Sequence, residues 1–166
     1  MQVFCGFNLH GGQLGYGYDQ HVGDGKGPSV AEAGAVPIST VSAFEMGDSS
    51  TCAISSGQVK CWGSNDQGSL GYYDFTPRGV TPDTTPDKLP GIALGEGFVP
   101  AGVLPGYAST CAWSTQGLVK CWGSFTNGYP GLQGVGVPNE VTIANAPLML
   151  TAQWVQGARR RWVGGA

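Results

Sequence analysis

Charged residues are scarce in this sequence. They make up 11% of the 166 residues, whereas glycine occurs 29 times and proline 11 times. Amphipathic helices normally need a charged outer face, so this balance favours many short strands joined by tight turns. A hydrophobic content of 41% excludes wholesale disorder, and the length suits a single domain that can bury a core.

Basic residues are especially few. The chain has eight, and three of them stand together at Arg159, Arg160 and Arg161, which leaves five to set against eleven acidic residues. We therefore expect no nucleic-acid partner. The arginine triplet is more typical of a solvated tail than of a site for anionic lipid or nucleic acid, because such sites usually need a longer cluster.

Long apolar runs are also missing. No stretch is long enough to cross a membrane as a helix, so we expect no membrane span. The first residues, from Met1 to Gly6, lack the basic start and apolar stretch of a signal peptide and look like the interior of a repeat. We therefore expect the chain to be a fragment of a longer protein.

Catalytic and cofactor motifs do not occur. The histidines are His10 and His21, and the sequence has no G-x-S-x-G, H-E-x-x-H or G-x-x-x-x-G-K-[ST] pattern. The glycine-rich run at 23–27 lacks the spacing of a phosphate loop, and Asp19 and Asp24 lack the spacing of a calcium loop. We expect no enzyme activity, no cofactor and no metal site.

An internal repeat is what the sequence does contain. Residues 50–71 read STCAISSGQVKCWGSNDQGSLG, and residues 109–131 read STCAWSTQGLVKCWGSFTNGYPG. A decayed copy opens the chain, where the GQLG at 12–15 parallels the GSLG at 68–71. Self-similarity at a fixed period indicates a tandem array of one structural unit.

Each good copy predicts a β-hairpin followed by a glycine turn. In the first copy, two apolar-rich segments flank Ser56 and Gly57, a two-residue connection that suits a primed hairpin turn. Counting outwards from this turn gives the expected cross-strand pairs: Ser55 with Gln58, Ile54 with Val59, Ala53 with Lys60 and Cys52 with Cys61. One face of the hairpin then carries both cysteines and two aliphatic side chains.

The second copy has a longer turn, Thr115-Gln116-Gly117, with glycine where a three-residue hairpin loop needs a left-handed residue. The expected register still pairs Cys111 with Cys121 and Trp113 with Val119.

Apolar segments precede both hairpins, at 41–46 and 98–104, although Pro100 and Gly102 weaken the second as a strand. We expect a three-stranded meander in each repeat, and a fourth strand is plausible. The connections at 16–37, 72–90 and 132–147 are long loops, and a further strand is expected at 148–155.

The succession G-x-x-S-T-C-A, G-x-V-K-C-W-G and N-x-x-G-Q-L-G resembles the repeats of the regulator of chromosome condensation family. The clearest copy matches at Gly47, Cys52, Ala53, Gly57, Val59, Cys61, Trp62, Gly63, Asn65, Gly68, Leu70 and Gly71. Complete members of the family look like closed β-propellers. The resemblance implies an all-β fold, here an incomplete β-propeller with about two to three blades of antiparallel meander.

The resemblance divides the chain into a single repeat array over 1–166. It comprises a degraded first repeat at 1–36, a second at 37–90, a third at 91–146 and the truncated start of a further repeat at 147–166. Because propellers close with roughly four to eight blades, we expect open blade faces and unpaired strand edges, which could permit self-association.

Four aromatic residues occupy equivalent positions in different copies of the repeat. Trp62 and Trp122 each come after a strand cysteine and before a glycine, which favours packing between blades over stacking on a ligand. Tyr16 and Tyr72 occupy matching positions after the glycine turn and are interpreted as structural.

Three other aromatic residues, Tyr18, Tyr73 and Phe75, are less constrained by the repeat and are candidate partner-binding anchors on long loops. The leading hypothesis is a protein-interaction scaffold that binds a macromolecular partner, whose identity the sequence does not specify, through loops on a propeller rim. The resemblance implies two alternatives, guanine-nucleotide exchange on a small GTPase and inhibition of a secreted enzyme, since fold does not fix function.

The four hairpin cysteines have three interpretations: disulfides, buried free thiols or zinc ligands. Structural zinc favours more closely spaced ligands, whereas opposed positions on neighbouring strands lie near disulfide reach. Disulfides would place the protein outside the cell or in the secretory pathway, and free thiols would fit the cytoplasm. Cys5 has no evident partner.

We predict that Cys52 bonds to Cys61 and Cys111 to Cys121. Each bond closes a short loop and should stabilise the fold by about 2 to 3 kcal/mol in the chain-entropy account. Mass spectrometry of non-reduced peptides tests the pairing. Recovery of free thiols in both hairpins after alkylation under native conditions, or of bridges between the two repeats, would overturn the register and the compartment inferred from it.

Overall fold

The computed structural model of the chain describes residues 2–3, 6 and 11–124. Several predictions made from the sequence fall outside these residues. They concern Cys5 and His10, the third glycine turn at 128–131, the loop at 132–147, the strand at 148–155, the segment 147–166 and the arginine triplet at 159–161.

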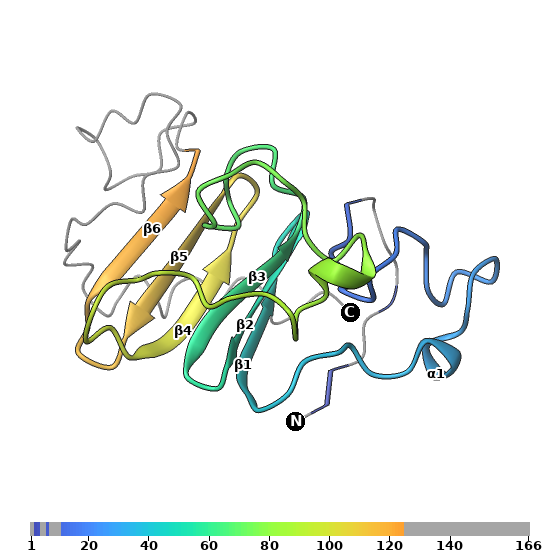
Figure 1. The fold of residues 1–166 in the computed structure, drawn as a ribbon, viewed down its shortest axis with the longest axis horizontal. Coiled ribbons are helices and arrows are strands. Elements are labelled where there is room, and N and C mark those ends of the chain that lie inside the picture. The colour runs from blue at the N-terminus through green and yellow to red at the C-terminus, as the bar shows by residue number, and fades with distance from the viewer. Residues whose placement is uncertain (1, 4–5, 7–10, 125–166) are drawn as a thin grey trace, which may run out of the picture.

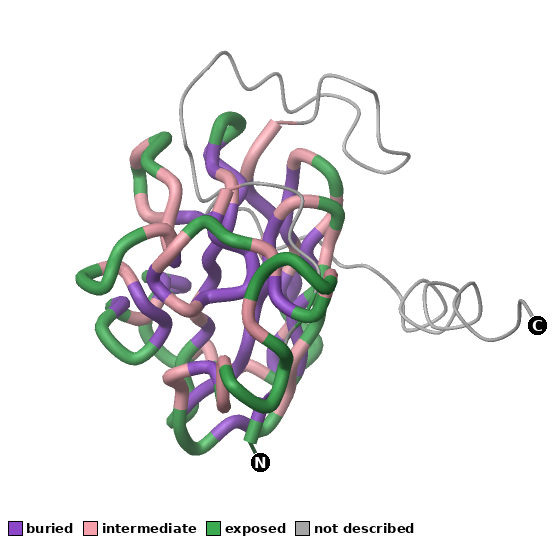
Figure 2. The backbone as a smooth tube through the Cα atoms, turned by 90° about the vertical axis from the view of Figure 1, so that its right-hand side faces the viewer, coloured by how far each residue is buried: buried purple, intermediate pink, exposed green. Residues whose placement is uncertain are grey.

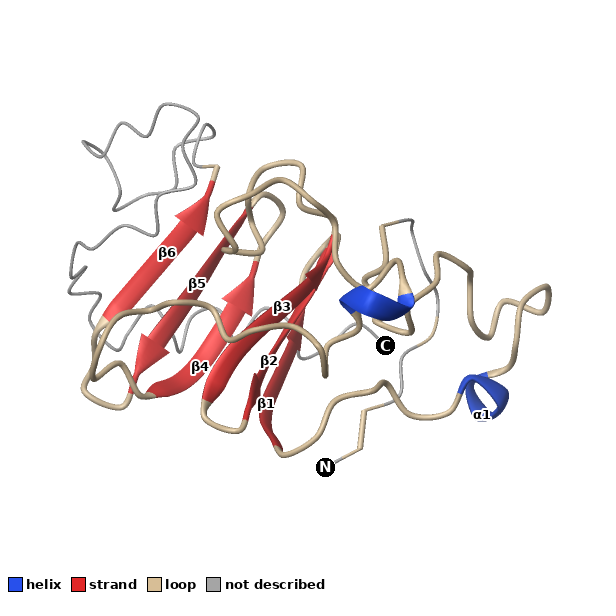
Figure 3. Ribbon diagram, in the orientation of Figure 1, coloured by secondary structure: helices blue, strands red, loops and turns tan. Residues whose placement is uncertain are grey.

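Two antiparallel three-stranded sheets form the body of the structure (Figure 1). The first contains β1 (Val41–Met46), β2 (Ser50–Ser55) and β3 (Gln58–Gly63), and the second contains β4 (Pro100–Pro105), β5 (Ser109–Ser114) and β6 (Val119–Gly123). Helix in the described residues is limited to α1 (Val30–Ala33) and the 3-10 turn η1 (Pro82–Thr84), so loops make up most of the remainder (Figure 3). The sheets follow one another along the chain, and β4 contacts both β1 and β2.

Both hairpins have the predicted register. In the first, Ser56 and Gly57 have φ angles of 49° and 76°, as a primed two-residue turn requires, and Cys52 faces Cys61. In the second, Gly117 has a φ of 81° and Cys111 faces Cys121. The added residue in the second turn is absorbed within the loop, so the pairing of the strands is unchanged.

The β4 strand differs from its expected position. The predicted segment was 98–104, whereas the strand is Pro100–Pro105 and includes both residues that weakened the prediction. Proline is tolerated because β4 is an edge strand, where an N–H that points away from the sheet forms no hydrogen bond with a neighbouring strand. Gly102 is required because a Cβ atom there would overlap the indole ring of Trp113 on the paired strand.

A fourth strand is not present in either sheet among the described residues. The outer edge of β3 is covered instead by three separate contacts from the chain that follows it. Gly63 and Arg78 form an isolated antiparallel bridge, Ile92 N donates to the Val59 carbonyl oxygen, and Cys61 N donates to the Tyr72 hydroxyl. This edge of the first sheet is therefore less open than expected, and self-association through blade edges stays a prediction.

The glycine turns at 12–15 and 68–71 have the same structure. In each turn the last glycine N–H donates to the carbonyl of the first, from Gly15 to Gly12 at 2.9 Å and from Gly71 to Gly68 at 3.2 Å. All four glycines have positive φ angles, and the leucine in each turn is buried. The decayed first copy therefore retains the turn of the clearer repeat.

Each glycine turn offers one carbonyl to the sheet that follows it. The Gln13 carbonyl oxygen accepts hydrogen bonds from Thr51 Oγ1 at 2.9 Å and from Trp62 Nε1 at 3.0 Å. Thr51 and Trp62 are opposed across β2 and β3, so their donors reach the same oxygen. This arrangement anchors the first sheet to the preceding repeat.

The second sheet is anchored in the same way. The Ser69 carbonyl oxygen accepts from Thr110 Oγ1 and from Trp122 Nε1, both at 2.8 Å. Thr110 and Trp122 are again a cross-strand pair. We call this contact the inter-blade joint. The indole rings are fully buried at both joints, which agrees with the interpretation of Trp62 and Trp122 as packing residues.

The apolar core consists of two clusters, one on each side of the first sheet. The buried stretches run through the centre of the molecule and the exposed ones through its outer loops (Figure 2). One cluster joins the cysteine face of β2 and β3 to Trp122 and Val103 of the second sheet. The other joins Trp62 on the opposite face to Leu14 and Val22 of the first repeat.

We expect Gly71→Ala to destabilise the protein more than Gly97→Ala. Both glycines have positive φ angles, of 82° and 74°, so both substitutions carry the backbone strain of a left-handed alanine. A Cβ atom at Gly71 would also lie 2.7 Å from Trp122 Nε1, whereas one at Gly97 would meet nothing within 4 Å. Urea unfolding should show that Gly71→Ala lowers the free energy of unfolding by about 1 to 3 kcal/mol more than Gly97→Ala does. Equal decreases for the two variants would contradict the close contact between Gly71 and Trp122 at the joint.

Candidate partner-binding rim

Three loops meet at one end of the strands, along the upper edge of the view in Figure 1. They are the β1–β2 turn at 47–49, the loop at 64–78 that follows β3, and the β4–β5 turn at 106–108. Close contacts join them: a Cβ atom on Gly47 would lie 2.9 Å from the Pro105 carbonyl oxygen, and Thr110 Oγ1 donates to the Ser69 carbonyl oxygen. We call these loops, with the strand ends beside them, the upper rim.

Exposed aromatic side chains gather on the upper rim. Tyr73 is 61% exposed, Phe75 53% and Tyr107 69%, and Met46 at the end of β1 is 50% exposed. In the described part of the chain, Tyr73, Phe75 and Tyr107 are the aromatic side chains that are more than half exposed. The opposite end of the sheets, where both hairpin turns lie, exposes the aliphatic residues Val99 and Leu118 instead.

Tyr107 was missed by the sequence analysis. It lies in the short turn between β4 and β5, at a position where the first copy has Asp48, so the repeat gives no signal there. The available signal was a large aromatic residue beside a glycine in a turn, where a packing role is uncommon.

Tyr18 has a different environment from the other two predicted anchors. Its ring stacks on that of Tyr16, with the centroids 5.7 Å apart, and it packs against the core cluster that contains Trp62. Tyr18 is half-buried and is not part of the upper rim. Its role in partner binding stays a prediction.

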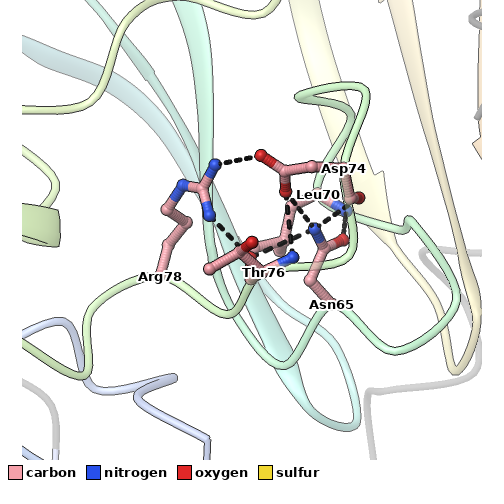
Figure 4. A network of polar contacts seen from close by, with 5 residues as sticks. All are labelled: Asn65, Leu70, Asp74, Thr76 and Arg78. Atoms are coloured by element: carbon pink, nitrogen blue, oxygen red, sulfur yellow. Dashed lines mark hydrogen bonds and ion pairs between the residues drawn. The ribbon is translucent and has the colours of Figure 1, made fainter.

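Asn65 organises the loop that carries Tyr73 and Phe75 (Figure 4). Its side chain is fully buried, and Nδ2 donates to the carbonyl oxygens of Asp74 at 2.8 Å and Thr76 at 3.2 Å. Its Oδ1 accepts from Leu70 N at 3.0 Å, inside the glycine turn. One amide thus connects the start, middle and end of the loop.

An ion pair closes the same network. Arg78 Nη2 contacts Asp74 Oδ2 at 2.6 Å, while Arg78 Nη1 donates to the Thr76 carbonyl oxygen at 2.7 Å. Asp74 Oδ1 accepts from Thr76 N at 3.0 Å and from Asn65 Nδ2 at 3.1 Å. Tyr73 and Phe75 alternate with these residues along the chain, so the inward polar contacts hold both aromatic side chains outward.

Tyr72 lies beneath this network. Its hydroxyl accepts from Cys61 N at 3.1 Å, and the Arg78 guanidinium lies 5.2 Å from the centre of its ring. Burial raises the pKa of Tyr72 to about 12, although the Cys61 hydrogen bond and the Arg78 charge act in the opposite direction. The phenol therefore stays neutral at physiological pH.

The charge of the upper rim is negative. Glu45 at the end of β1, Asp48 in the β1–β2 turn and Asp66 in the loop at 64–78 are all exposed. Asp66 accepts from Ser64 Oγ at 3.3 Å. Arg78 supplies positive charge in this loop, but it is already paired with Asp74.

The paired cysteines lie within the hairpins, and in the first hairpin they stand two residues from the strand ends that border the upper rim. The Sγ atoms of Cys52 and Cys61 are 2.10 Å apart, and those of Cys111 and Cys121 are 2.11 Å apart. The first pair is fully buried between the two sheets. Both pairs join the partners that the register predicts.

Among the described residues, no group of three or more His, Cys, Asp and Glu side chains is arranged to hold a metal ion. No helix in the same part of the chain has the length and apolar character needed to cross a membrane.

Comparison with known proteins identifies similar repeats. The chain is 36% identical over 124 residues to the human protein named regulator of chromosome condensation, covering 73% of this chain and 26% of that protein. No protein-family model matches the chain.

Two solved structures have the same fold. Yeast Prp20 (RCC1) bound to Kap60 aligns with a TM-score of 0.61 and 19% identity, covering 82% of this chain and 29% of that one. Prp20p from Saccharomyces cerevisiae, studied for its binding to Gsp1p and histones, aligns with a TM-score of 0.55 and 18% identity, covering 89% and 35%. The partial β-propeller predicted from the sequence is confirmed, and the chain spans about a quarter to a third of these relatives.

We expect the free energy of unfolding to depend on Tyr72 at alkaline pH. Because its folded pKa is raised, the neutral phenol stabilises the fold fully below about pH 10, and this contribution is lost as pH rises towards about 12. Tyr72→Phe should be less stable at neutral pH, because Cys61 N loses its acceptor, yet its stability should fall less steeply above about pH 10.

Tyr73→Phe is the matched control, since it removes an exposed phenol from the neighbouring position. Urea unfolding over the alkaline range should give this control the same pH slope as the wild type. Parallel slopes for all three proteins would show that Tyr72 is not buried as described.

Proposed function

Because the chain belongs to the regulator of chromosome condensation repeat family, we propose that it is a protein-interaction scaffold that binds a macromolecular partner through the upper rim. The proposal assigns it no catalytic step. The observation that carries it is the position of Tyr73, Phe75 and Tyr107, three exposed aromatic side chains from two separate loops at one end of the sheets.

Aromatic side chains supply a large share of the binding energy at protein interfaces. Exposing them to water is unfavourable in a free protein, so their concentration on one end marks that end as an interaction surface. The Asn65 network adds a second reason. It orders the loop before any partner arrives, which lowers the entropy lost when Tyr73 and Phe75 are immobilised.

The solved relatives support protein binding in general terms. One of them is seen bound to Kap60, and the other was studied with Gsp1p and histones. Both are much longer than this chain, and these partners are those of the relatives themselves. The likeness supports a propeller that binds proteins, while nucleotide exchange on a GTPase and inhibition of a secreted enzyme stay as alternatives within that description.

Substitution of the rim aromatics should weaken the binding of ligands selected on the wild-type chain. Peptides selected from a random phage-displayed library on the full chain should bind the variants Tyr73→Ala/Phe75→Ala and Tyr107→Ala about tenfold or more weakly, which is the usual effect of removing an interface anchor. Affinities measured by biolayer interferometry with the purified variants provide the test.

The matched control is Val99→Ala/Leu118→Ala, which removes exposed aliphatic side chains at the opposite end. It should leave the affinities of the selected peptides unchanged. Peptides that are indifferent to the rim substitutions but sensitive to the control pair would place the binding surface elsewhere and refute the proposal.

A nucleotide-release assay separates the scaffold from the exchange factor. The chain should leave the release rate of labelled GDP from a panel of small GTPases unchanged. Stimulated release would refute a pure scaffold and favour the exchange alternative.

A further inference from the structure

We infer that the upper rim recognises a lysine- or arginine-rich segment of its partner. The inference rests on the proposed function, because it names the chemistry of the partner that the same surface would take. It is carried by the combination of uncompensated acidic side chains and exposed aromatic rings on these loops.

Three acidic residues of the upper rim have no cation to neutralise them within the described part of the chain. Glu45, Asp48 and Asp66 are exposed, and none of them forms an ion pair within the described part of the chain. They come from β1, the β1–β2 turn and the loop after β3, so the negative charge extends over two of the three rim loops. A surface of one sign attracts segments of the opposite sign and repels those of its own.

Nearby cations are already committed to other contacts. Arg78 is paired with Asp74 and donates to the Thr76 carbonyl, so it is satisfied within the loop. Lys60 donates to the carbonyl oxygens of Pro86 and Asp87, and Lys120 donates to that of Leu94. These lysines hold the connection between the two repeats and are not available to balance the rim.

Cationic groups suit the aromatic residues as well as the acidic ones. A guanidinium or ammonium group is attracted to the face of an aromatic ring, and two such contacts occur among the described residues. Arg78 lies 5.2 Å from the ring centre of Tyr72, and Lys120 lies 5.8 Å from that of Phe98. Tyr73, Phe75 and Tyr107 offer rings of the same kind to a cation from outside.

The opposite end of the sheets has less acidic charge, with exposed Glu96 near Val99, and lacks strongly exposed aromatic side chains among the described residues. The hairpin turns at 56–57 and 115–117 contain no charged residue, and no aromatic side chain is strongly exposed there in the described chain. An acidic partner on the upper rim would place like charges together and leave them unpaired, which selects against it. We therefore expect a cationic segment to bind at the upper rim and not at the end that carries the hairpin turns.

The test uses fluorescein-labelled peptides that share one Gly-Ser framework and differ only in carrying Arg, Gln or Glu at the same positions. Fluorescence anisotropy with the full chain should show binding of the Arg peptide, weaker binding of the Gln peptide and no binding of the Glu peptide. Raising the ionic strength should weaken the Arg complex, because exposed charge pairs are screened by salt. Failure of the Arg peptide to bind overturns the inference.

Location is tested with two variants that have the same change in net charge. The rim variant is Glu45→Gln/Asp48→Asn/Asp66→Asn, and the matched control is Asp83→Asn/Asp87→Asn/Glu96→Gln, whose acidic residues lie in the connection between repeats. The rim variant should bind the Arg peptide about tenfold more weakly, whereas the control should change its affinity by less than about twofold. Equal losses would show a general attraction to an acidic protein and overturn the inference.

The remaining outcomes separate this inference from the proposed function. If the Glu or Gln peptide binds best and loses affinity in Tyr73→Ala/Phe75→Ala, the rim is a binding surface but the cationic preference is wrong. If the library-selected peptides ignore the rim aromatics, the proposed function itself fails.

Discussion

The fold depends on one carbonyl oxygen per repeat that accepts two hydrogen bonds from the next repeat. The donors are a threonine hydroxyl and a tryptophan indole, which come from neighbouring strands and meet at Gln13 in one joint and at Ser69 in the other. Gln13 and Ser69 are buried, so water does not reach their carbonyl oxygens. Leaving either oxygen without a donor would therefore destabilise the fold. Each joint therefore anchors a sheet to the repeat before it.

The candidate binding surface follows from the joint. Because both sheets are attached by equivalent residues, they have the same orientation, and their turns therefore gather at the same end (Figure 1). The glycine turn that supplies the Ser69 carbonyl also begins the loop held by Asn65, since Leu70 N donates to the Asn65 side chain. The contact that joins the blades and the contact that orders the rim thus share a few adjacent residues.

Short-range chemistry explains which features were predictable from the sequence. The hairpin turn and the two-residue alternation of strands were sufficient to give the register of Cys52 with Cys61 and of Cys111 with Cys121. Repetition at equivalent positions indicated that Trp62 and Trp122 pack between blades. Each of these inferences uses residues close together in the chain or repeated along it.

Features outside the repeat pattern were less accessible. The Asn65, Asp74 and Arg78 network joins residues of one aperiodic loop, where spacing gives no indication of contact. The β4 strand contains a proline and a glycine that local preference disfavours, and its glycine is explained only by the Trp113 ring on the paired strand. Helix α1 lay inside a predicted loop, although its capping box of Ser29 and Glu32 is a local signal that could have been used.

The direction of the inter-blade joint has a consequence for synthesis. Thr51 and Trp62 reach back to Gln13, and Thr110 and Trp122 reach back to Ser69, so each acceptor is made before its donors. During translation, the carbonyl of a completed repeat can bind water until the next hairpin leaves the ribosome and replaces it. The order of synthesis thus permits the joints to form one after another, from the N-terminal repeat onwards.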